Sequence, residues 1–538
     1  MTDTQTVPAP AKPEKKKQPK GLYLLFGAEA WERFSYYGMR AILVLYLCAA
    51  TTAGAAHAGL GFSRSEALAL YGTYCGLVYL TPMIGGFLAD HILGARKAII
   101  IGGITMALGE MCMASPSLLF AAMALLILGN GFFKPNISTI VGGLYEENDP
   151  RIDGGFTIFY MGINLGSFFA PLICGTLGTM YGFKYGFITA GIGMIIGQII
   201  FNMGFKHYGI TGYPPDMENP KPGTPLRKKD WMDIVLYVLS LIAITAVAVI
   251  IAPILFPNSM NAPLPCAAVL LLLATVGLHY ATKEKYAKFA AAKALKEQPQ
   301  AADSETAASS PAKLHMGFTV EEWQRIAVII ILSCFVIFFW MGFEQAGGSM
   351  TLFAEQKTDR ALNGFTIPAA WFQSINPFVI CAFAPLFSMM WTAWDNSKYK
   401  IATPYKMAMG LFFLSLGFVV MYIADGRVVF DTAGEVSQGV SPLWLTSVYF
   451  LHTMGELCLS PVGLSMVTKL APQRIMSIMM GFWFLSSAVS DYTAGILESL
   501  LTGFGLNLWH FLIFSSAGAG VLLLLMGPIL KKWMHGRA

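Results

Sequence analysis

Charged residues are scarce in this sequence: Asp, Glu, Lys and Arg make up 12% of its 538 residues, about half of their share in ordinary soluble domains. Hydrophobic residues make up 55%, and the mean hydropathy is +0.58. A soluble core stops growing at about 250–300 residues, so a single soluble enzyme does not accommodate this much apolar sequence. The composition also excludes a disordered chain, a collagen-like chain and a disulfide scaffold. It predicts an all-α integral membrane protein with many spans.

Signatures of metal, redox and nucleotide chemistry are also missing. The eight cysteines are scattered singly and form no CxxC pair, which argues against a zinc or thioredoxin-type site. The sequence contains no HExxH, GxxxxGK[ST] or GxSxG motif, so it lacks the marks of a zinc protease, an ATP-driven pump and a serine hydrolase. Its polar, basic N-terminus is typical of a cytoplasmic tail rather than a cleaved signal peptide. We therefore expect no enzyme activity, metal, cofactor or nucleic-acid partner.

Long apolar runs account for most of the remaining sequence. A helix needs about 20 apolar residues to cross a hydrocarbon core of ~30 Å, and fourteen segments approximately satisfy this length. Of the 36 Lys and Arg residues, 28 lie in loops or tails on the side of the N-terminus and 5 on the other side. The positive-inside rule then predicts that both termini are cytoplasmic. The predicted spans are 21–50, 66–90, 97–115, 118–143, 155–178, 185–206, 231–254, 264–283, 322–353, 367–394, 405–424, 442–468, 473–501 and 508–531.

The predicted spans fall into three groups. Six precede and six follow a nearly uncharged pair, and polar linkers flank that pair. This layout predicts two six-helix bundles plus an inserted two-helix hairpin, which we interpret as a lipid-facing spacer, with a direct substrate role as the alternative. The predicted divisions are a cytoplasmic tail at 1–20, an N-terminal bundle at 21–206, a cytoplasmic linker at 207–230, the transmembrane hairpin at 231–283, a flexible cytoplasmic linker at 284–320, a C-terminal bundle at 321–531 and a cytoplasmic tail at 532–538.

The first span carries an unusual density of polar side chains. Ionisable groups at membrane depth are costly unless they are paired or hydrated, so they indicate function by default. At 100° per residue, one narrow stripe is formed by Glu29, Arg33, Tyr36 and Arg40, and Glu32 and Tyr37 lie on its flanks. Such a stripe must face protein or a cavity. The alternative is a purely structural helix contact in which Glu29 pairs with Arg33. The polar residues of this span are Glu29, Glu32, Arg33, Tyr36, Tyr37 and Arg40.

Further polar residues divide by charge between the two halves of the chain. Lys134 precedes Pro135 in the fourth span, where a kink would suit a cavity wall, whereas the isolated acids Glu344 and Glu456 lie in the second half. Cations on one wall and carboxylates on the other match a small zwitterion, and partly buried carboxylates can exchange protons near neutral pH. The residues thus predict proton-coupled transport of a peptide or amino acid. Asp491 is a weaker candidate. Another is a face of the fifth span formed by Tyr160, Asn164 and Ser167, which helix packing would also explain.

Several short motifs occur in a fixed order along the chain. They are ExxER (Glu29, Glu32 and Arg33) followed by YYGMR, GGFLADHILGARK at 85–97, GNGFFKPN, FYMGINLGS, FFWMGFEQ, FQSINPF, and GELCLSPVGLSMVTKLAP before MMGFWFLS. In these motifs the chain resembles the proton-dependent oligopeptide transporter (POT) family of the major facilitator superfamily, bacterial type. The resemblance runs from the first span to the thirteenth. The inserted hairpin lies outside it and is a feature of bacterial members.

The resemblance implies two six-helix bundles around a central site that is exposed alternately to the two sides of the membrane. It implies that Glu456 holds the amino terminus of a peptide, and that Arg33, Lys134 and Asn164 bind its carboxylate. Glu344 would pair with Arg40 or Lys134 when the outer side closes, and protonation of Glu344 would weaken that pair. The implied proton-coupling residues are Glu29, Glu32, Arg33 and Glu344. The further implied peptide-binding residues are Tyr36, Tyr37, Arg40, Tyr79, Asn376, Ser460 and Trp483.

One position departs from the family pattern: Gly72 stands where mammalian-type members have a proton-sensitive histidine, and His57 in the preceding loop is no substitute. Proton coupling would therefore rest on carboxylates. We expect a monomeric symporter in the inner membrane, surrounded by membrane lipid, that uses the proton gradient to import di- and tripeptides. The alternatives are transport of another solute, such as nitrate, an amino acid or a peptide-like drug, and a non-transporting sensor or scaffold. Glu456 favours peptides because an anion carrier needs no amine anchor.

Overall fold

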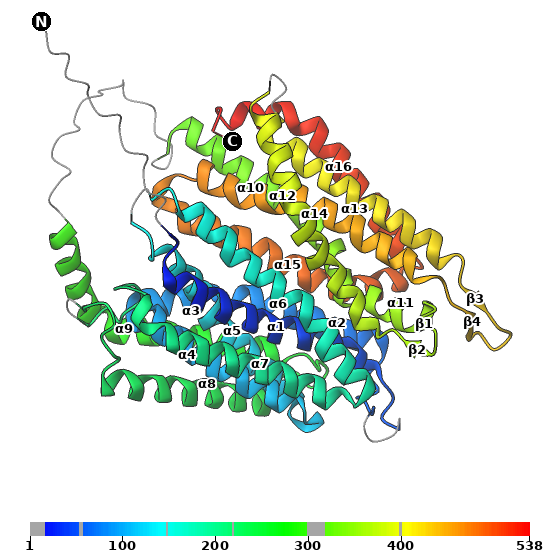
Figure 1. Ribbon diagram of the computed structural model, residues 1–538, viewed down its shortest axis with the longest axis horizontal. Helices are drawn as coiled ribbons and strands as arrows, with labels where there is room; N and C mark the ends of the chain where they lie inside the picture. The colour runs from blue at the N-terminus through cyan, green and yellow to red at the C-terminus, as the bar shows by residue number, and fades with distance from the viewer. Residues whose placement is uncertain are drawn as a thin grey trace, which may run out of the picture.

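The protein consists of long helices joined mostly by short loops, with two small β-hairpins at one end (Figure 1). Of the seven predicted divisions, all but the transmembrane hairpin at 231–283 contain some residues outside the described ranges. The computed structural model describes residues 17–52, 57–146, 149–217, 220–297, 318–397 and 401–537.

Helices from the N-terminal part of the chain form one group. Their bounds are α1 Lys20–Cys48, α2 Arg64–Leu80, α3 Pro82–Leu88, α4 Ala95–Met113, α5 Leu119–Gly142, α6 Ile152–Met180 and α7 Phe183–Met203. α1 packs against α6 and α7, and α4 packs against α5. The contact of α1 with α6 depends on Gly166, because a Cβ there would collide with the backbone carbonyl of Ala30. Small residues of this kind let membrane helices approach closely.

Helices from the C-terminal part form a second group. Their bounds are α10 Val320–Phe343, α11 Ser349–Lys357, α12 Ile375–Asp395, α13 Thr403–Asp425, α14 Pro442–Leu470, α15 Met476–Gly503 and α16 Leu508–Trp533. Short 3-10 turns precede α11, α12 and α15 at Glu344–Gly347, Ala369–Ser374 and Gln473–Ile475. α13 packs against α14 and α16, and α10 packs against α15. The two groups lie side by side, with the first group below the second in the view of Figure 1.

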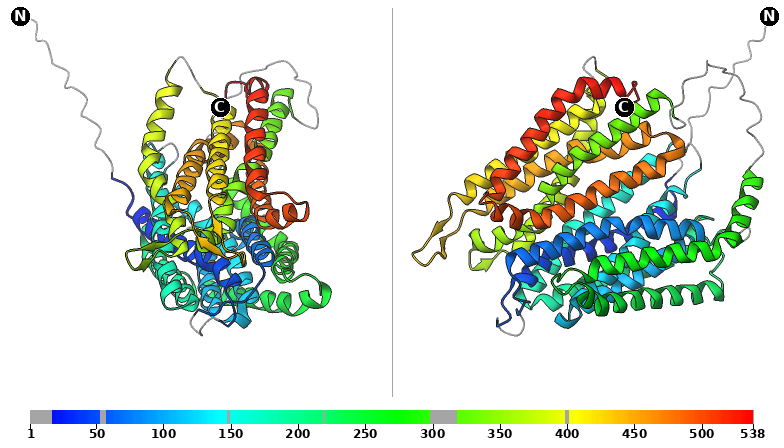
Figure 2. Two further views of the ribbon diagram at one scale, coloured as in Figure 1. Left: turned by 90° about the vertical axis from the view of Figure 1, so that its right-hand side faces the viewer. Right: turned by 180° about the vertical axis from the view of Figure 1, so that it is seen from behind.

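Two antiparallel β-hairpins mark one end of the second group. β1 (Ala361–Leu362) pairs with β2 (Phe365–Thr366), and β3 (Val429–Phe430) pairs with β4 (Val436–Gln438). The turn between β1 and β2 is Asn363-Gly364, whose φ angles of 48° and 83° suit these two residue types. We call this end of the molecule the hairpin end and the opposite end, where α1 begins and α16 finishes, the terminal end (Figure 2).

The inserted helices α8 (Lys228–Leu255) and α9 (Pro263–Glu297) pack on the first group, against α4 and α5. Their outer faces are apolar and exposed. At the terminal end, Lys97 of α4 holds α8 in place, because its Nζ lies 3.2 Å from Asp230 Oδ1 and 2.8 Å from Asp233 Oδ2. The adjacent Arg96 donates hydrogen bonds to backbone carbonyls of the loop before α8, including Thr211 at 2.8 Å. Arg96 and Lys97 therefore tie both the loop and α8 to the first group.

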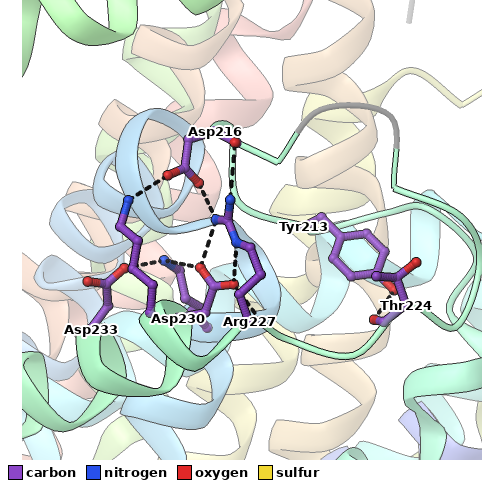
Figure 3. Close-up of polar contacts among 8 residues, drawn as sticks. Tyr213, Asp216, Thr224, Arg227, Asp230 and Asp233 are labelled. Carbon is purple, nitrogen blue, oxygen red and sulfur yellow. Dashed lines mark hydrogen bonds and ion pairs between the residues drawn. The ribbon is translucent and has the colours of Figure 1, made fainter.

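A network of ion pairs extends this attachment into the loop that precedes α8 (Figure 3). Asp216 accepts hydrogen bonds from Arg227 at 2.6 Å and from Lys229 at 2.9 Å. Arg227 also donates to Asp230 at 2.9 Å. Burial opposes ionisation of Asp216, but the hydrogen bonds from Lys229 and Arg227 outweigh it and lower the pKa of Asp216 to about 2. The network is therefore fully charged at neutral pH.

Each predicted span coincides with helical structure, although two spans predicted as continuous are interrupted. The second breaks between α2 and α3 at Thr81, because Pro82 has no N–H to continue the helix. The ninth breaks at Glu344, where a 3-10 turn separates α10 from α11. Within the part of the chain that the structure describes, ten helical segments are long and apolar enough to cross a membrane. The long helices outside that set are α1, α4, α14 and α15, three of which bring polar residues to the cavity described next.

Candidate functional site

A cavity of about 360 Å³ lies between the two helical groups. Its volume falls in the range of small-molecule sites, about 300–1,000 Å³. The first group contributes side chains from α1, α2, α5 and α6, and the second group contributes side chains from α10, α12, α14 and α15. The sequence-predicted residues that line it are Glu29, Arg33, Tyr37, Arg40, Tyr79, Lys134, Asn164, Glu344, Asn376, Glu456, Ser460 and Trp483. The weaker candidates Tyr160 and Ser167 also line it.

The α1 wall of the cavity is centred on a buried arginine. Arg33 Nε lies 3.1 Å from Glu29 Oε1, and Arg33 Nη2 donates to Glu32 Oε1 at 2.7 Å. Arg33 therefore has two carboxylate partners on its own helix, one turn and one residue away. The ion pair of Glu29 with Arg33 does exist, but both residues also face the cavity. The polar residues of α1 therefore form an ion pair within the helix and also line the cavity.

A second cation, Lys134 of α5, contributes to the same wall. Its Nζ lies 3.8 Å from the ring centroid of Tyr79, a cation–π distance. Lys134 makes no ion pair with a described carboxylate, so its charge faces the cavity without a fixed counter-ion. Asn164 of α6 lies on this side as well and donates its Nδ2 hydrogen to the Tyr160 carbonyl at 3.0 Å. The α5 helix continues through Pro135 to Gly142.

The opposite wall carries a carboxylate held by neutral donors. Glu456 of α14 accepts a hydrogen bond from Asn376 Nδ2 at 2.7 Å, and the same amide lies 3.1 Å from Thr453 Oγ1. Glu456 is 9% exposed and has no ion-pair partner among the described residues. Trp483 of α15 also lines the cavity and packs over Gly463, where a Cβ would collide with the indole ring. Asn376 therefore orients Glu456 without neutralising it, which leaves the carboxylate available to a cationic ligand.

Contacts between the two helical groups close the cavity at the hairpin end. Arg40 of α1 pairs with Glu344, which lies in the 3-10 turn after α10, and Arg40 Nε also donates to Tyr71 at 2.5 Å. Nearer the surface, Arg64 Nε lies 2.5 Å from Glu498 Oε1. The α6 helix contributes as well, since Trp371 Nε1 donates to Thr176 Oγ1 at 2.9 Å. Lys134, which was also expected to reach Glu344, makes no ion pair with it in this structure.

Two helices of opposite groups meet backbone to backbone at this end. Gly72 of α2 faces Gly495 of α15 so closely that a Cβ on Gly72 would lie 2.6 Å from the Gly495 Cα atom. Gly76 makes a similar approach one turn further, 2.8 Å from the Ala488 carbonyl by the same measure. Because backbone atoms cannot move aside as a flexible side chain can, glycine at position 72 permits this helix contact.

Two predicted site residues lie behind the cavity wall. Tyr36 was expected to line the pocket, but its ring is 3% exposed and packs edge-to-face on Tyr37, which takes the wall position. Glu32 is fully buried beside Arg33 and reaches the cavity only through that arginine. The weak candidate Asp491 is buried on α15, close to the Gly72 crossing, and does not line the cavity either.

Sequence reasoning missed several lining residues on α14 and in the turn before α12. Tyr449, His452 and Thr453 line the cavity, and so does Gln373. The sequence does contain a signal for Tyr449, His452 and Thr453, because they precede Glu456 by seven, four and three residues and so share its helix face. His452 packs against Phe418 with ring centroids 4.6 Å apart, which places its ring toward α13. No comparable periodicity marks Gln373, because it lies in a 3-10 turn.

Comparison with known proteins supplies independent evidence. A family model described as the POT family matches residues 96–508. The chain is similar to the peptide transporter YePEPT of Yersinia enterocolitica, with 34% identity over 94% of this chain and 93% of the relative. It is also similar to a di-/tripeptide transporter of Lactococcus lactis, with 34% identity over 96% of each chain. Among solved structures, a mutant peptide transporter in complex with alafosfalin matches with a TM-score of 0.73 at 33% identity, over 96% of each chain.

Proposed function

This chain belongs to the POT family, and from that membership we propose that it is a proton-coupled symporter that imports di- and tripeptides by alternating access. It is a multi-pass membrane transporter with the major facilitator fold, and it is not an enzyme. The observation that carries the substrate class is the charge distribution in the central cavity. Two cations of the first group, Arg33 and Lys134, face a carboxylate of the second group, Glu456, which has no cationic partner among the described residues.

A peptide zwitterion complements this distribution. Its ammonium group would bind Glu456, because a carboxylate oriented by Asn376 but not neutralised gains a charge-assisted hydrogen bond from the ligand. Its carboxylate would bind near Lys134 and Arg33, with Asn164 as a further donor. An inorganic anion such as nitrate would leave Glu456 unpaired beside it, so the same distribution disfavours the alternative cargo.

Proton coupling would act on the carboxylates that form ion pairs with Arg40 and Arg33 in this structure. A proton added to Glu344 removes its charge and weakens its pair with Arg40, which is one of the contacts between the two helical groups at the hairpin end. A proton added to Glu29 or Glu32 similarly releases Arg33 toward the peptide carboxylate. Proton uptake by Glu344 would therefore favour opening of the hairpin end, and proton uptake by Glu29 or Glu32 would favour peptide binding.

The membrane placement and domain division follow from the same proposal. Both termini would be cytoplasmic in the inner membrane, so that the closed hairpin end faces outward and the conformation described here faces inward. The bundles at 21–206 and 321–531 would rotate against each other about the cavity. The inserted hairpin at 231–283 would move with the first bundle, because Lys97 pairs with Asp230 and Asp233.

Uptake of a labelled dipeptide into proteoliposomes with an imposed inward proton gradient tests the proposal. Accumulation above a gradient-free control is expected. Competition by unlabelled dialanine, but not by its N-acetylated form or by nitrate, is expected as well, because only a free amine can bind Glu456. No gradient-dependent accumulation would refute symport. Equal competition by nitrate and dialanine would refute the peptide assignment while leaving transport intact.

A further inference from the structure

An apolar groove lies between the inserted helices and the first helical group. It has a volume of about 260 Å³ and shares no lining residue with the central cavity. Its floor is formed by buried side chains of the first group, Leu88 of α3 and Phe132 of α5. Its rim includes the exposed residues Leu236 and Ser240 of α8 and Ala274 of α9. The groove therefore opens on the membrane-facing surface of the molecule.

The dimensions and chemistry of the groove suit a hydrocarbon chain. Along α8 its lining runs from Leu236 to Ile244, which corresponds to about 12 Å of helix. One leaflet of a bilayer core measures about 15 Å, so the groove spans most of one leaflet. The lining contains no charged side chain. The hydroxyl of Ser240 donates to the Leu236 carbonyl at 2.8 Å and so is already bonded within its own helix.

A pair of histidines lies next to the terminal-end mouth of the groove. His91 follows the floor residue Leu88 by three positions, and His279 directly follows a lining residue of α9. Their ring centroids are 6.4 Å apart, and both rings pack on Phe87. His91 Nδ1 donates to the Phe87 carbonyl at 2.9 Å, so only the doubly protonated ring has an Nε2–H left to donate to a phosphate oxygen. Lys283 lies one turn beyond His279 on the same helix.

The acidic side chain of α8 nearest the mouth does not repel an anion there. Asp233 precedes Leu236 by one turn and is labelled in Figure 3. Its carboxylate lies 2.8 Å from Lys97 Nζ, so its charge is already compensated. The mouth thus offers imidazole groups and an ammonium group near the ends of two candidate membrane spans, Arg64–Leu93 and Pro263–Glu284, beside a groove for an acyl chain.

We propose that this groove is a binding site for one phospholipid molecule, with an acyl chain between α8, α9 and the first group and with the phosphate at His91 and His279. The lipid would fill the space that the two inserted helices leave over Leu88 and Phe132. It would thereby add an apolar contact between α9 and the first group. The inference concerns the inserted helices and does not depend on the transported substrate.

Native mass spectrometry of the full chain in detergent, titrated with phosphatidylglycerol, tests the acyl-chain part. Ala274→Phe fills the rim of the groove and should weaken phosphatidylglycerol binding at least tenfold. Ala246→Phe makes the same change on an exposed face of α8 outside the groove and should bind as the wild type does. Unchanged binding by Ala274→Phe would overturn the proposal. So would an Ala274→Phe variant that loses a dimer instead of a lipid, since the groove would then hold a second copy of the chain.

The headgroup part is tested with a diacylglycerol that carries the same acyl chains but no phosphate. The wild type should bind phosphatidylglycerol at least tenfold more tightly than this diacylglycerol. The double variant His91→Ala and His279→Ala should bind the two equally, while its melting temperature and dipeptide uptake show that it is folded. Equal binding of both lipids by the wild type, or an unchanged preference in the double variant, would overturn the assignment of the phosphate to the histidine pair.

Discussion

The buried ion pair between Arg40 and Glu344 makes a quantitative prediction for Glu344→Gln. The two side chains are 8% and 7% exposed, and removing one partner of a buried pair costs about 3–5 kcal/mol. Glutamine keeps an acceptor for Arg40, so we take the lower value of about 3 kcal/mol, which corresponds to about a 150-fold change in an equilibrium. Because the pair joins the two helical groups, this cost falls on the state in which the hairpin end is closed. A closed population of about 99% would fall to about 40%.

Spin labels at the exposed residues Ser65 and Ser437 report this opening by double electron–electron resonance, in a background without the exposed Cys334 and Cys381. Glu344→Gln should add a longer-distance population that is rare in the wild type. Glu498→Gln provides the matched control.

The control breaks a pair of the same kind whose side chains are more exposed. Arg64 and Glu498 also join the two groups, but they are 35% and 21% exposed. An exposed pair contributes about 0–1 kcal/mol, so its loss should change the equilibrium about fivefold at most. A Glu344→Gln distance distribution identical to that of the wild type would refute the reasoning. Equal effects of the two substitutions would show that burial does not set the strength of the contact.

Three further predictions concern other charged groups. Glu456→Gln should reduce initial dipeptide uptake at least tenfold with little change in melting temperature, because glutamine can still accept the hydrogen bond of Asn376; wild-type uptake would contradict this role. Glu32→Gln should abolish gradient-driven uptake but retain counterflow exchange, and equal loss of both would assign Glu32 to binding or folding. Asp216→Asn should destabilise the protein at pH 7 by about 1 kcal/mol after allowance for solvent screening. Because the pKa of Asp216 is lowered from 3.8 to about 2, this difference should be full above about pH 4 and disappear in melting curves as the pH falls toward 2.

The sequence predicted the helices and the α1 stripe because both depend on local patterns. Apolar runs of membrane-spanning length define the spans, and helical periodicity places Glu29, Arg33 and Arg40 on one face. Periodicity also placed Tyr36 on this stripe and Tyr37 on its flank, whereas in the structure Tyr37 lines the cavity and Tyr36 lies behind it. Two adjacent residues differ by 100° around the helix, and only the position of the neighbouring helices makes one of them part of the wall.

The interruptions of the predicted spans show a second limit of prediction from sequence. Pro82 was a visible signal for the break after α2, since proline removes a helical hydrogen bond. The turn at Glu344 depends on a distant contact, because Gly347 packs directly against the Tyr71 side chain. No window of sequence around Glu344 contains that information. The pairing of Arg40 with Glu344 instead came from a family resemblance, which carries tertiary information that one sequence lacks.

The backbone contact of Gly72 with Gly495 has a consequence for protein engineering. A histidine cannot be grafted at position 72 as a single change, since its first side-chain atom would already collide with the partner helix. Restoring the mammalian-type histidine would require a compensating rearrangement of α15. The two positions should therefore vary together in any library that seeks a new pH optimum, and variation of either one alone should enrich only for glycine.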